Sequence, residues 1–348
     1  MIDEKLTEFE TLDIDPLIAE KPAVERDKSR LIVLNRNDKT ITHTFFYEIV
    51  DYFGPGDCLV LNESKVIKSR LFYYENNLPK GDILLVQKYD EEGKKWLCLS
   101  RKLKTNKRYS IDGGALIEKI DRYENFYLLE FDRVIDFEYL SKYGKVPLPL
   151  YIIRKRKEKN IDSITPEDEL RYQTVYASVY GSIAAPTAGF HFTQDIFERL
   201  CSKGVYIVKI ILHIGYGTFK MVNTNPSDFK MPSEKCYIPP YSAEIINTVK
   251  KNGGRIFAVG TSVMRALEKM SNENGIVLSG NGESDIFIKA GWKFKVADCF
   301  ITNLHVPNSP PLYMTAAFAS RDFLFKAYKE AVEKKYRFYS YGDAMLII

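Results

Sequence analysis

The chain has 348 residues, of which 45% are hydrophobic and 28% are charged, and this composition is typical of a folded globular protein rather than a disordered one. The length predicts about two domains. The net charge of +4 allows contact with a polyanion but excludes the strongly basic composition of a dedicated nucleic-acid-binding module.

The cysteines and the apolar runs exclude several other classes of protein. The five cysteines are scattered and form no CxxC pair, so we expect neither a disulfide framework nor a zinc ribbon. The acidic N-terminal segment lacks the basic and apolar regions of a signal peptide. No run approaches the roughly 20 apolar residues of a membrane helix. We therefore expect a cytoplasmic protein with no membrane contact and no obligate protein partner.

The first 145 residues divide into two stretches of different texture. Residues 1–71 contain a short buried strand at 58–61, which follows the turn at 54–57. Residues 72–145 carry turn signals about every ten residues, with short β-rich runs between them at 82–87, 95–99 and 126–131. This spacing is typical of a small antiparallel barrel or sandwich.

Residues 146–348 alternate between strands and helices. Thr193 predicts the start of a helix over 194–202, and the apolar run that follows predicts a strand over 205–214. We also expect helices over 242–253 and 311–335, a helix that carries Met264, Leu267 and Met270, and strands over 255–259 and 294–301. The alternation favours a mixed sheet covered by helices. The predicted fold is therefore a discontinuous α/β domain, residues 1–71 plus 146–348, with a small β-barrel domain inserted at 72–145.

Polar and small residues follow three of these predicted strands. The segments are His213-Ile214-Gly215-Tyr216-Gly217-Thr218, Gly260-Thr261-Ser262 and Thr302-Asn303-Leu304-His305. Ligands of open α/β sheets bind outside the carboxyl ends of the strands, where small residues let the backbone approach. We therefore expect one binding site assembled from these distant segments.

The four histidines sharpen this prediction, because only His43 lies outside the Gly-, Thr- and Asn-rich segments. Imidazole suits proton transfer near neutral pH, although any single histidine is adequately explained as a cap on a strand end. A three-histidine metal site would normally include a close pair such as HxH or HExxH, which is missing, so we expect no metal. GxSxG and GxGxxG motifs are also missing, which argues against a serine hydrolase and a dinucleotide site.

Several segments resemble the S-adenosylmethionine:tRNA ribosyltransferase-isomerase family of queuosine biosynthesis. The most specific are YQTVYA at 172–177 and GSIAAPTAGFHFT at 181–193. RDKSRL at 26–31, PGDCLVLNESKVI at 55–67, LHIGYGTF at 212–219 and RFYSYGDAM at 337–345 match the family in the same order. The resemblance covers nearly the whole chain.

The resemblance implies an α/β domain with an inserted β-barrel and an enzyme that needs S-adenosylmethionine as co-substrate but no metal. It also implies transfer and isomerisation of the ribosyl group of S-adenosylmethionine onto 7-aminomethyl-7-deazaguanine in the anticodon arm of tRNA. Adenine and methionine are then released, and the product is epoxyqueuosine-tRNA.

The sulfonium of the donor acidifies the neighbouring C5′ protons, so a base can start this reaction, and an acid can assist the departure of adenine. The candidate acids and bases are His191, His213 and His305, with Asp343 as an orienting or basic carboxylate. Aromatic rings suit adenine or the sulfonium, hydroxyls and amides suit ribose, and an arginine suits the methionine carboxylate. The substrate-binding candidates are Asn62, Tyr172, Gln173, Pro186, Thr187, Ala188, Gly189, Phe190, Gly215, Tyr216, Gly217, Thr218, Thr261, Arg265, Thr302, Asn303 and Tyr341.

Some positions depart from the family pattern. FKMPSE at 229–234 lacks both histidines of the family's HxMHSE, Tyr216 stands where alanine is usual, and a lysine of TNFHLPKST is missing after His305. These differences keep two alternatives open: a paralogue with a small-molecule acceptor, and a non-catalytic relative that binds RNA or nucleosides. The basic run 154–159, together with Lys102, Lys104, Lys107 and Arg108, is the expected docking place of an anticodon arm, with a solvated basic loop as the alternative.

Overall fold

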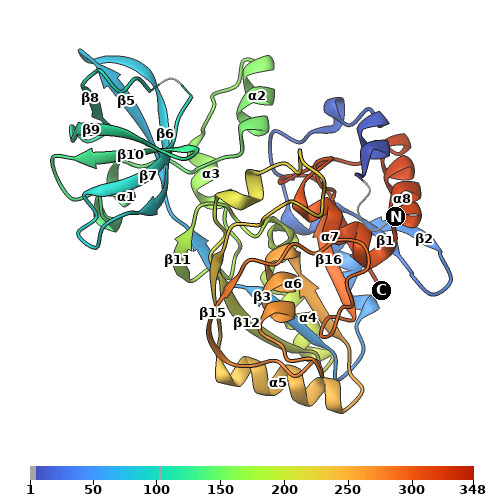
Figure 1. Ribbon diagram of the computed structural model, residues 1–348. Helices are drawn as coiled ribbons and strands as arrows, with labels where there is room; N and C mark the ends of the chain where they lie inside the picture. Colours follow the sequence, from blue (N-terminus) through green and yellow to red (C-terminus); the bar gives the residue numbers. More distant parts are fainter. Residues whose placement is uncertain (1–4, 102) are drawn as a thin grey trace.

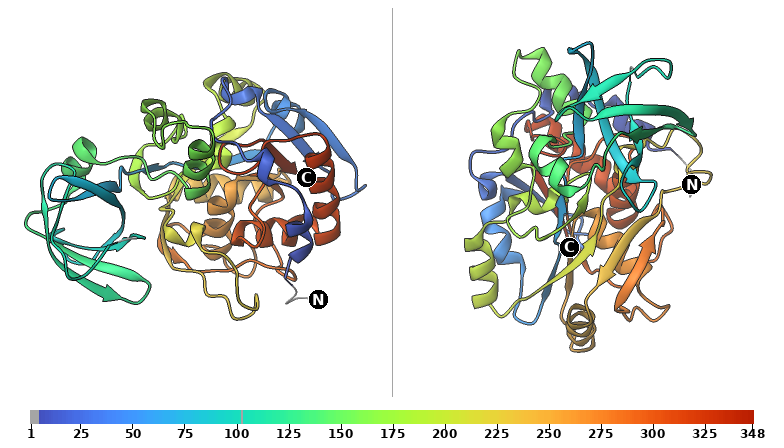
Figure 2. Two further views of the ribbon diagram at one scale, coloured as in Figure 1. Left: turned by 90° about the horizontal axis from the view of Figure 1, so that it is seen from above. Right: turned by 90° about the vertical axis from the view of Figure 1, so that its left-hand side faces the viewer.

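The computed structural model describes residues 5–101 and 103–348. An α/β body carries a β-barrel that projects from one side of it (Figures 1 and 2). This arrangement confirms the predicted fold class. The proposed division at 71/72 and 145/146 stays a prediction, although the strands of the barrel lie between Arg70 and Phe131.

A mixed sheet forms the centre of the body, and it has nine strands in the described part of the chain, in the order β15-β13-β12-β3-β14-β16-β17-β1-β2. Strands β12, β3, β14 and β16 are parallel neighbours, whereas β17 runs antiparallel to β16. The bounds are β1 Arg30–Leu34, β2 Ile41–Phe45, β3 Cys58–Asn62, β12 Tyr206–Leu212, β13 Glu234–Ile238, β14 Ile256–Val259, β15 Gly280–Ser284, β16 Cys299–Asn303 and β17 Ala344–Ile347.

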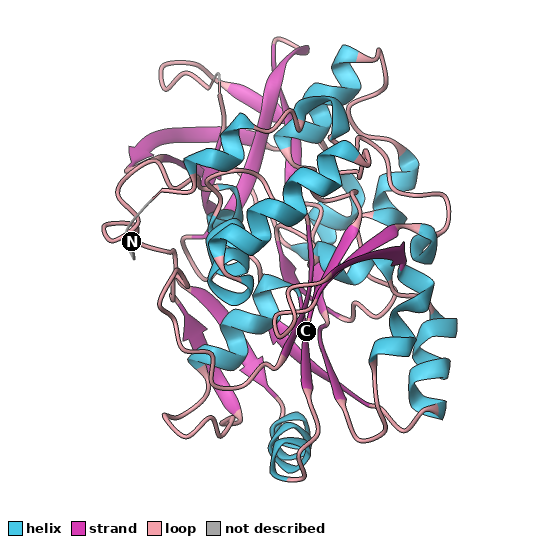
Figure 3. Ribbon diagram, turned by 90° about the vertical axis from the view of Figure 1, so that its right-hand side faces the viewer, coloured by secondary structure: helices cyan, strands magenta, loops and turns pink. Residues whose placement is uncertain are grey.

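Helices cover both faces of this sheet (Figure 3), which explains why β3, β14 and β16 are apolar runs buried along their whole length. One face packs against α5 Pro240–Lys251, α6 Gly260–Lys269, α7 Pro310–Ala319 and α8 Arg321–Glu333. The other face packs against the 3-10 helix η4 Phe46–Tyr52 and α4 Gln194–Ser202.

The barrel is closed, with the strand order β10-β7-β6-β5-β8-β9. Its strands are β5 Arg70–Glu75, β6 Leu78–Lys88, β7 Lys95–Leu99, β8 Tyr109–Ile111, β9 Leu116–Tyr123 and β10 Phe126–Phe131. Helix α1 Phe137–Tyr143 adds Leu140 to the barrel core. The chain then returns to the body through α2 Leu150–Glu158 and α3 Pro166–Arg171.

Short elements complete the chain. Strand β4 Ser64–Val66 pairs in parallel with β11 Val179–Ser182. The remaining 3-10 helices are η1 Thr7–Thr11, η2 Asp15–Leu17, η3 Arg26–Lys28, η5 Thr187–His191 and η6 Tyr216–Phe219.

Helix α4 confirms the prediction from its N-cap, because the Thr193 hydroxyl accepts a hydrogen bond from the backbone N–H of Ile196. The prediction of one long helix over 311–335 was wrong. Ser320, with φ 76° and ψ 146°, separates α7 from α8, and the apolar pattern continues across the break because both helices pack on the same core.

The predicted strand over 294–301 was too long, because the strand begins only at Cys299. The aromatic residue that suggested the earlier start, Phe294, packs edge-on against Phe318 at a ring-centroid distance of 4.8 Å. Its apolar side chain therefore fills the core from a loop.

Candidate active site

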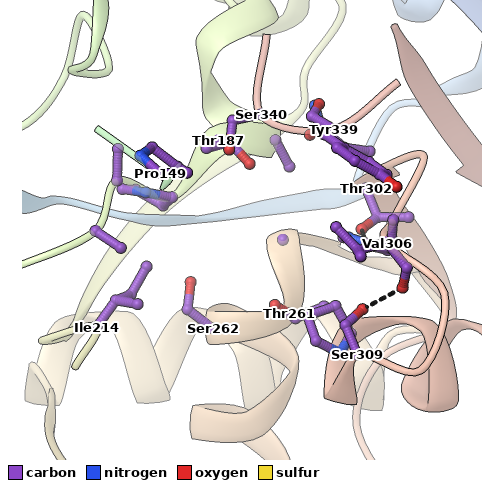
Figure 4. Close-up of a pocket in the computed structure, with 18 of the residues that line it drawn as sticks. Pro149, Thr187, Ile214, Thr261, Ser262, Thr302, Val306, Ser309, Tyr339 and Ser340 are labelled. Carbon is purple, nitrogen blue, oxygen red and sulfur yellow. Dashed lines mark hydrogen bonds between the residues drawn. The ribbon is translucent and has the colours of Figure 1, made fainter. Parts of the chain in front are cut away.

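The carboxyl ends of β3, β12, β14 and β16 meet at one edge of the sheet, as expected for parallel neighbours. A cavity of about 110 Å³ opens there. Figure 4 shows Thr187 and Ser340 on one side, Thr261 and Ser262 on the other, and Ile214 toward one end. Among the predicted site residues, those that line it are Tyr172, Pro186, Thr187, Ala188, Thr261, Arg265, Thr302, Asn303 and His305.

Arg265 supplies a fixed cation to this cavity. It lies on α6, is 6% exposed, and forms an ion pair with the buried carboxylate of Glu234 through Nη2. Its Nη1 is buried without a hydrogen-bond partner. The other oxygen of Glu234 accepts a hydrogen bond of 2.8 Å from the backbone N–H of Gly215. One side of the guanidinium is therefore anchored while the other is available to a ligand carboxylate.

Asn303, at the end of β16, presents a second unsatisfied group. Its Nδ2 donates to the carbonyl of Tyr339 at 3.1 Å, whereas its buried Oδ1 has no partner. Buried polar atoms are nearly always hydrogen-bonded. Asn303 and Arg265 both line the first cavity, so each can offer a polar atom to a ligand there, and the Asn303 side chain also raises the pKa of His191.

His305 lines the same cavity. Its Nε2 lies 2.6 Å from Oγ1 of Thr302, and its backbone N–H donates to the hydroxyl of Tyr328 at 2.7 Å. Burial lowers the pKa of His305 to about 3, so the imidazole is neutral at physiological pH. The ring is held in place by the side-chain contact with Thr302 and the backbone contact with Tyr328.

His191 lies in a second, smaller cavity of about 20 Å³, which shares Ser340 with the first. Its Nδ1 lies 2.7 Å from Oγ of Ser29, and its Nε2 is buried without a partner. Burial, together with the charges of Arg26 and Arg337, lowers the pKa of His191 to about 3. The structure therefore places two neutral imidazoles in adjoining cavities. The other predicted residues that line the second cavity are Phe190 and Tyr341.

His213 is not brought to either cavity. Its Nδ1 lies 2.7 Å from Oγ of Ser64, which is itself 2.6 Å from Oγ of Ser182. The ring stands so close to Gly181 that a Cβ there would lie 2.5 Å from it, and burial together with the charge of Lys235 lowers the pKa of His213. We expected three histidines at one site. His191 and His305 line adjoining cavities, whereas His213 lines neither.

Several candidates stabilise the walls of the cavity instead of lining it. Both oxygens of Asp343 accept backbone hydrogen bonds, from Arg30 at 2.9 Å and from Arg337 at 2.7 Å. Of the two expected roles, an orienting carboxylate and a base, these contacts favour the orienting one. Asn62 is fully buried and bonds Leu212 and Ser64. The side-chain amide of Gln173 accepts a hydrogen bond from the backbone N–H of Val66 and donates one to its carbonyl, as the backbone of a neighbouring strand would.

Of the segment after β12, Ile214 lines the first cavity, whereas residues 215–217 line neither cavity. Gly215 supports Glu234, and Gly217 packs against Pro232 and Met231. Tyr216 contacts Phe126 of the barrel edge-on, with ring centroids 4.8 Å apart. Gly189 packs against Tyr176. The side chain of Thr218 lies outside the described residues.

The basic run at 154–159 is not a continuous docking surface. It lies largely on α2, and Arg156 is buried in an ion pair with Asp168, with nitrogen–oxygen distances of 2.5 and 2.8 Å. Arg154 and Lys155 both pair with Asp15. In the barrel, Lys107 pairs with Glu75, while Lys104 and Arg108 are exposed and Lys102 lies outside the described residues. Most of the run is therefore neutralised within the protein.

The profile of the family described as "Queuosine biosynthesis protein" matches residues 11–347. The chain belongs to the queuosine biosynthesis protein family.

Relatives of this queuosine biosynthesis protein extend over nearly the whole chain. Proteins named S-adenosylmethionine:tRNA ribosyltransferase-isomerase from Sulfurihydrogenibium sp. and Dehalococcoides mccartyi are each 42% identical, covering 99% and 95% of this chain and 100% and 96% of the relatives. A solved structure, the S-adenosylmethionine tRNA ribosyltransferase from Thermotoga maritima, has a TM-score of 0.54 and 31% identity, and covers 100% of this chain and 99% of that one.

Several residues that line or support the cavities were not predicted from the sequence of this family member. Glu234 was noted only as the end of a divergent motif, and Ser29 and Arg26 only as part of a matching segment. Ser262, expected only as part of the segment 260–262, and Ser340, named only within a matching segment, also line the first cavity. Only the family segments that contain them could have pointed to these residues, because single serines and arginines carry no pattern of their own.

Two further findings concern metal sites and membrane helices in the described part of the chain. No group of three or more His, Cys, Asp or Glu side chains is placed to hold a metal ion within residues 5–101 and 103–348. No helix in the part of the chain covered by the structure is long and apolar enough to cross a membrane.

Proposed function

We propose that this protein transfers and isomerises the ribosyl group of S-adenosylmethionine onto 7-aminomethyl-7-deazaguanine in tRNA, with release of adenine and methionine and formation of epoxyqueuosine-tRNA. Its membership of the family and the names of its relatives support the reaction. The observation that supports it best is the cavity at the carboxyl edge, where Arg265 and Asn303 each hold an unpartnered polar atom beside the neutral His305.

The first cavity suits the donor. The free side of Arg265 would bind the methionine carboxylate, and the hydroxyls of Thr187, Thr261 and Ser262, which line the same cavity, would bind ribose oxygens. Tyr172 lines the same cavity and offers an aromatic face to the sulfonium or to adenine. Both parts of the donor therefore have chemically matched partners.

His191 is the base that we propose for the C5′ proton. The hydroxyl of Ser29 lies 3.3 Å from the carbonyl of Arg26, to which it can donate, and 2.7 Å from Nδ1 of His191. Both contacts are satisfied when Nδ1 carries the imidazole proton and donates it to Ser29. Nε2 then presents a lone pair that can accept a proton, and the side chain of Asn303 hydrogen-bonds the protonated imidazole and so raises the pKa of His191. His305 is neutral, so we propose it as a hydrogen-bond partner of the donor, and the proton that His191 takes up is the one available to the departing adenine.

Release of adenine tests the reaction. The protein is incubated with S-adenosylmethionine, with and without tRNA that carries 7-aminomethyl-7-deazaguanine, and free adenine is measured by chromatography. We expect adenine only when the modified tRNA is present. Equal adenine in both incubations would rule out this acceptor, and its absence in both would rule out the reaction.

A pair of variants tests the proposed base. His191→Ala should reduce turnover by about 10²–10⁴-fold without loss of the folded state, the range that general acid–base groups contribute. His43→Ala is the matched control, because His43 pairs with Tyr336 and Glu330 away from both cavities. A normal rate for His191→Ala would remove this residue from the catalytic machinery.

A further inference from the structure

Two arginines, Arg26 and Arg171, line the second cavity beside His191. Arg26 donates to the carbonyls of Phe190 at 3.1 Å and Leu170 at 3.2 Å, and no carboxylate in residues 5–101 and 103–348 lies within ion-pair distance of it. Each contact is to a backbone carbonyl, which orients the guanidinium but leaves its charge uncompensated.

Arg171 has the same character. It donates to the carbonyls of Ala23 and Val24, and its buried Nε has no partner. Its ion pair with Glu167 is long, at 3.4 Å, and the Glu167 side chain is 59% exposed. Such exposed pairs within one helix contribute little. Two oriented guanidiniums therefore face one small cavity with little negative charge beside them.

The two charges affect each other and the histidine. Burial, with the charge of Arg171, lowers the pKa of Arg26 to about 10, so Arg26 remains charged at neutral pH. The charge of Arg26 is also one of the causes that lower the pKa of His191. Binding of an anion would offset the positive charge of the two guanidiniums.

The position of Arg26 and Arg171 relative to the first cavity indicates which anion they bind. Ser340 lines both cavities, so a nucleotide that places its base against a donor in the first cavity would have its backbone near the second. Val24 and Leu170, whose carbonyls hold the arginines, are 93% and 76% exposed and leave this rim open to a large partner. By contrast, the basic residues of α2 are largely paired with carboxylates.

We propose that Arg26 and Arg171 form a phosphodiester-binding site that holds the RNA backbone next to the nucleotide being modified. The proposal rests on the proposed function, since it assumes that the acceptor is an RNA. Guanidinium groups bind phosphate oxygens in a planar, bidentate manner, and several preoriented donors reduce the entropic loss on binding. A free carboxylate, such as that of the donor, is the other anion of matching chemistry.

The test measures binding rather than turnover. Arg26→Gln, Arg171→Gln and the double variant are compared with wild type for their affinity for full-length tRNA over a series of salt concentrations. We expect the double variant to bind about tenfold or more weakly and its slope of log Kd against log salt to fall by roughly 1.4, about 0.7 for each lost contact with a single-stranded phosphate. Arg26→Lys with Arg171→Lys should keep most of the slope.

Lys157→Gln is the matched control, because it removes one exposed positive charge from α2. Unchanged tRNA affinity and slope in the double Gln variant, or an equal loss in Lys157→Gln, would overturn the proposal. Calorimetry with S-adenosylmethionine alone should give the wild-type Kd, and a weakened Kd would instead assign the pair to the donor carboxylate and overturn the RNA assignment.

Hydrogen exchange and adenine release separate failure of the phosphate site from unfolding of the variants and from failure of the proposed function. If the Gln variants unfold, slowed hydrogen exchange of residues 22–26 in the wild-type protein on tRNA binding supports the site, and unchanged exchange contradicts it. If wild type binds tRNA with the expected slope yet releases no adenine, the proposed function fails while the phosphate site stands. If adenine forms normally and the slope does not depend on the two arginines, only the phosphate site fails.

Discussion

Arg265 and Glu234 illustrate how a single buried ion pair prepares a ligand site. Glu234 is 4% exposed and holds both the guanidinium of Arg265 and the backbone N–H of Gly215. The carboxylate thus fixes the cation and the glycine-rich segment together. Neither residue alone would position a carboxylate-binding group, because an unpaired buried charge is strongly unfavourable.

This pairing predicts a separation of stability from binding. Arg265→Met should destabilise the protein by about 3–5 kcal/mol, because Glu234 is left buried and unpaired. The double variant Arg265→Met with Glu234→Gln should recover much of that stability in urea unfolding. Both variants should bind S-adenosylmethionine at least about tenfold more weakly by calorimetry. Wild-type affinity in the double variant would show that Arg265 does not contact the donor.

At the level of elements, side chains replace missing main-chain partners around the cavity. Gln173 completes the hydrogen bonds of Val66, and Asn62 joins β3 to the end of β12. Thr193 caps α4. These contacts place the catalytic segments without entering the cavity themselves.

The break between α7 and α8 gives a prediction at this scale. Ser320 has φ 76° and ψ 146° and is exposed, a backbone conformation that costs a non-glycine residue about 1–3 kcal/mol. Ser320→Gly should therefore raise the free energy of unfolding by roughly 1 kcal/mol after the larger entropy loss of glycine is included. Ser320→Ala keeps the strain and should give no gain in urea unfolding, so an equal gain from alanine would show that the backbone conformation is not the cause.

At the scale of the whole molecule, two aromatic contacts join the barrel to the body. Tyr216 meets Phe126 with ring centroids 4.8 Å apart, and Tyr180 meets Phe137 at 4.5 Å. Tyr216 stands where the family pattern has alanine, so its bulk extends toward the barrel instead of into the donor cavity. This departure from the family pattern therefore changes the junction between the two parts.

The buried histidines predict how the stability of the whole chain depends on pH. Burial lowers the pKa of His191 to about 3, well below its value of about 6.5 in an unfolded chain. The unfolded state therefore binds more protons below pH 6.5, and the stability present above that pH is lost as the pH falls toward 3. The free energy of unfolding measured in urea should decrease from pH 7 to pH 5, by up to about 1.4 kcal/mol for each pH unit from this residue.

His191→Gln isolates the contribution of this residue to the pH dependence. Its unfolding free energy should depend less steeply on pH between 6.5 and 4 than that of wild type. An identical slope would show that His191 is not the buried neutral group responsible. His305, whose pKa is also lowered to about 3, should account for part of the remaining slope.

The sequence by itself determined the family, the class of fold and the segments that surround the cavity. These features follow from local signals: the apolar run of β3, the Thr193 cap of α4, and short β-rich runs between turns. The carboxyl ends of parallel strands must lie at one edge, so the site at 260–262 and 302–305 was also predictable.

Only the tertiary structure decided which polar residues face a ligand. His213 and His191 look equivalent in sequence, but Gly181 and two serines hold the first away from the cavities. Both carboxylate oxygens of Asp343 accept hydrogen bonds from backbone N–H groups. The reason is physical: whether a polar atom is free depends on partners that come from distant segments, and burial sets the charge of those that remain.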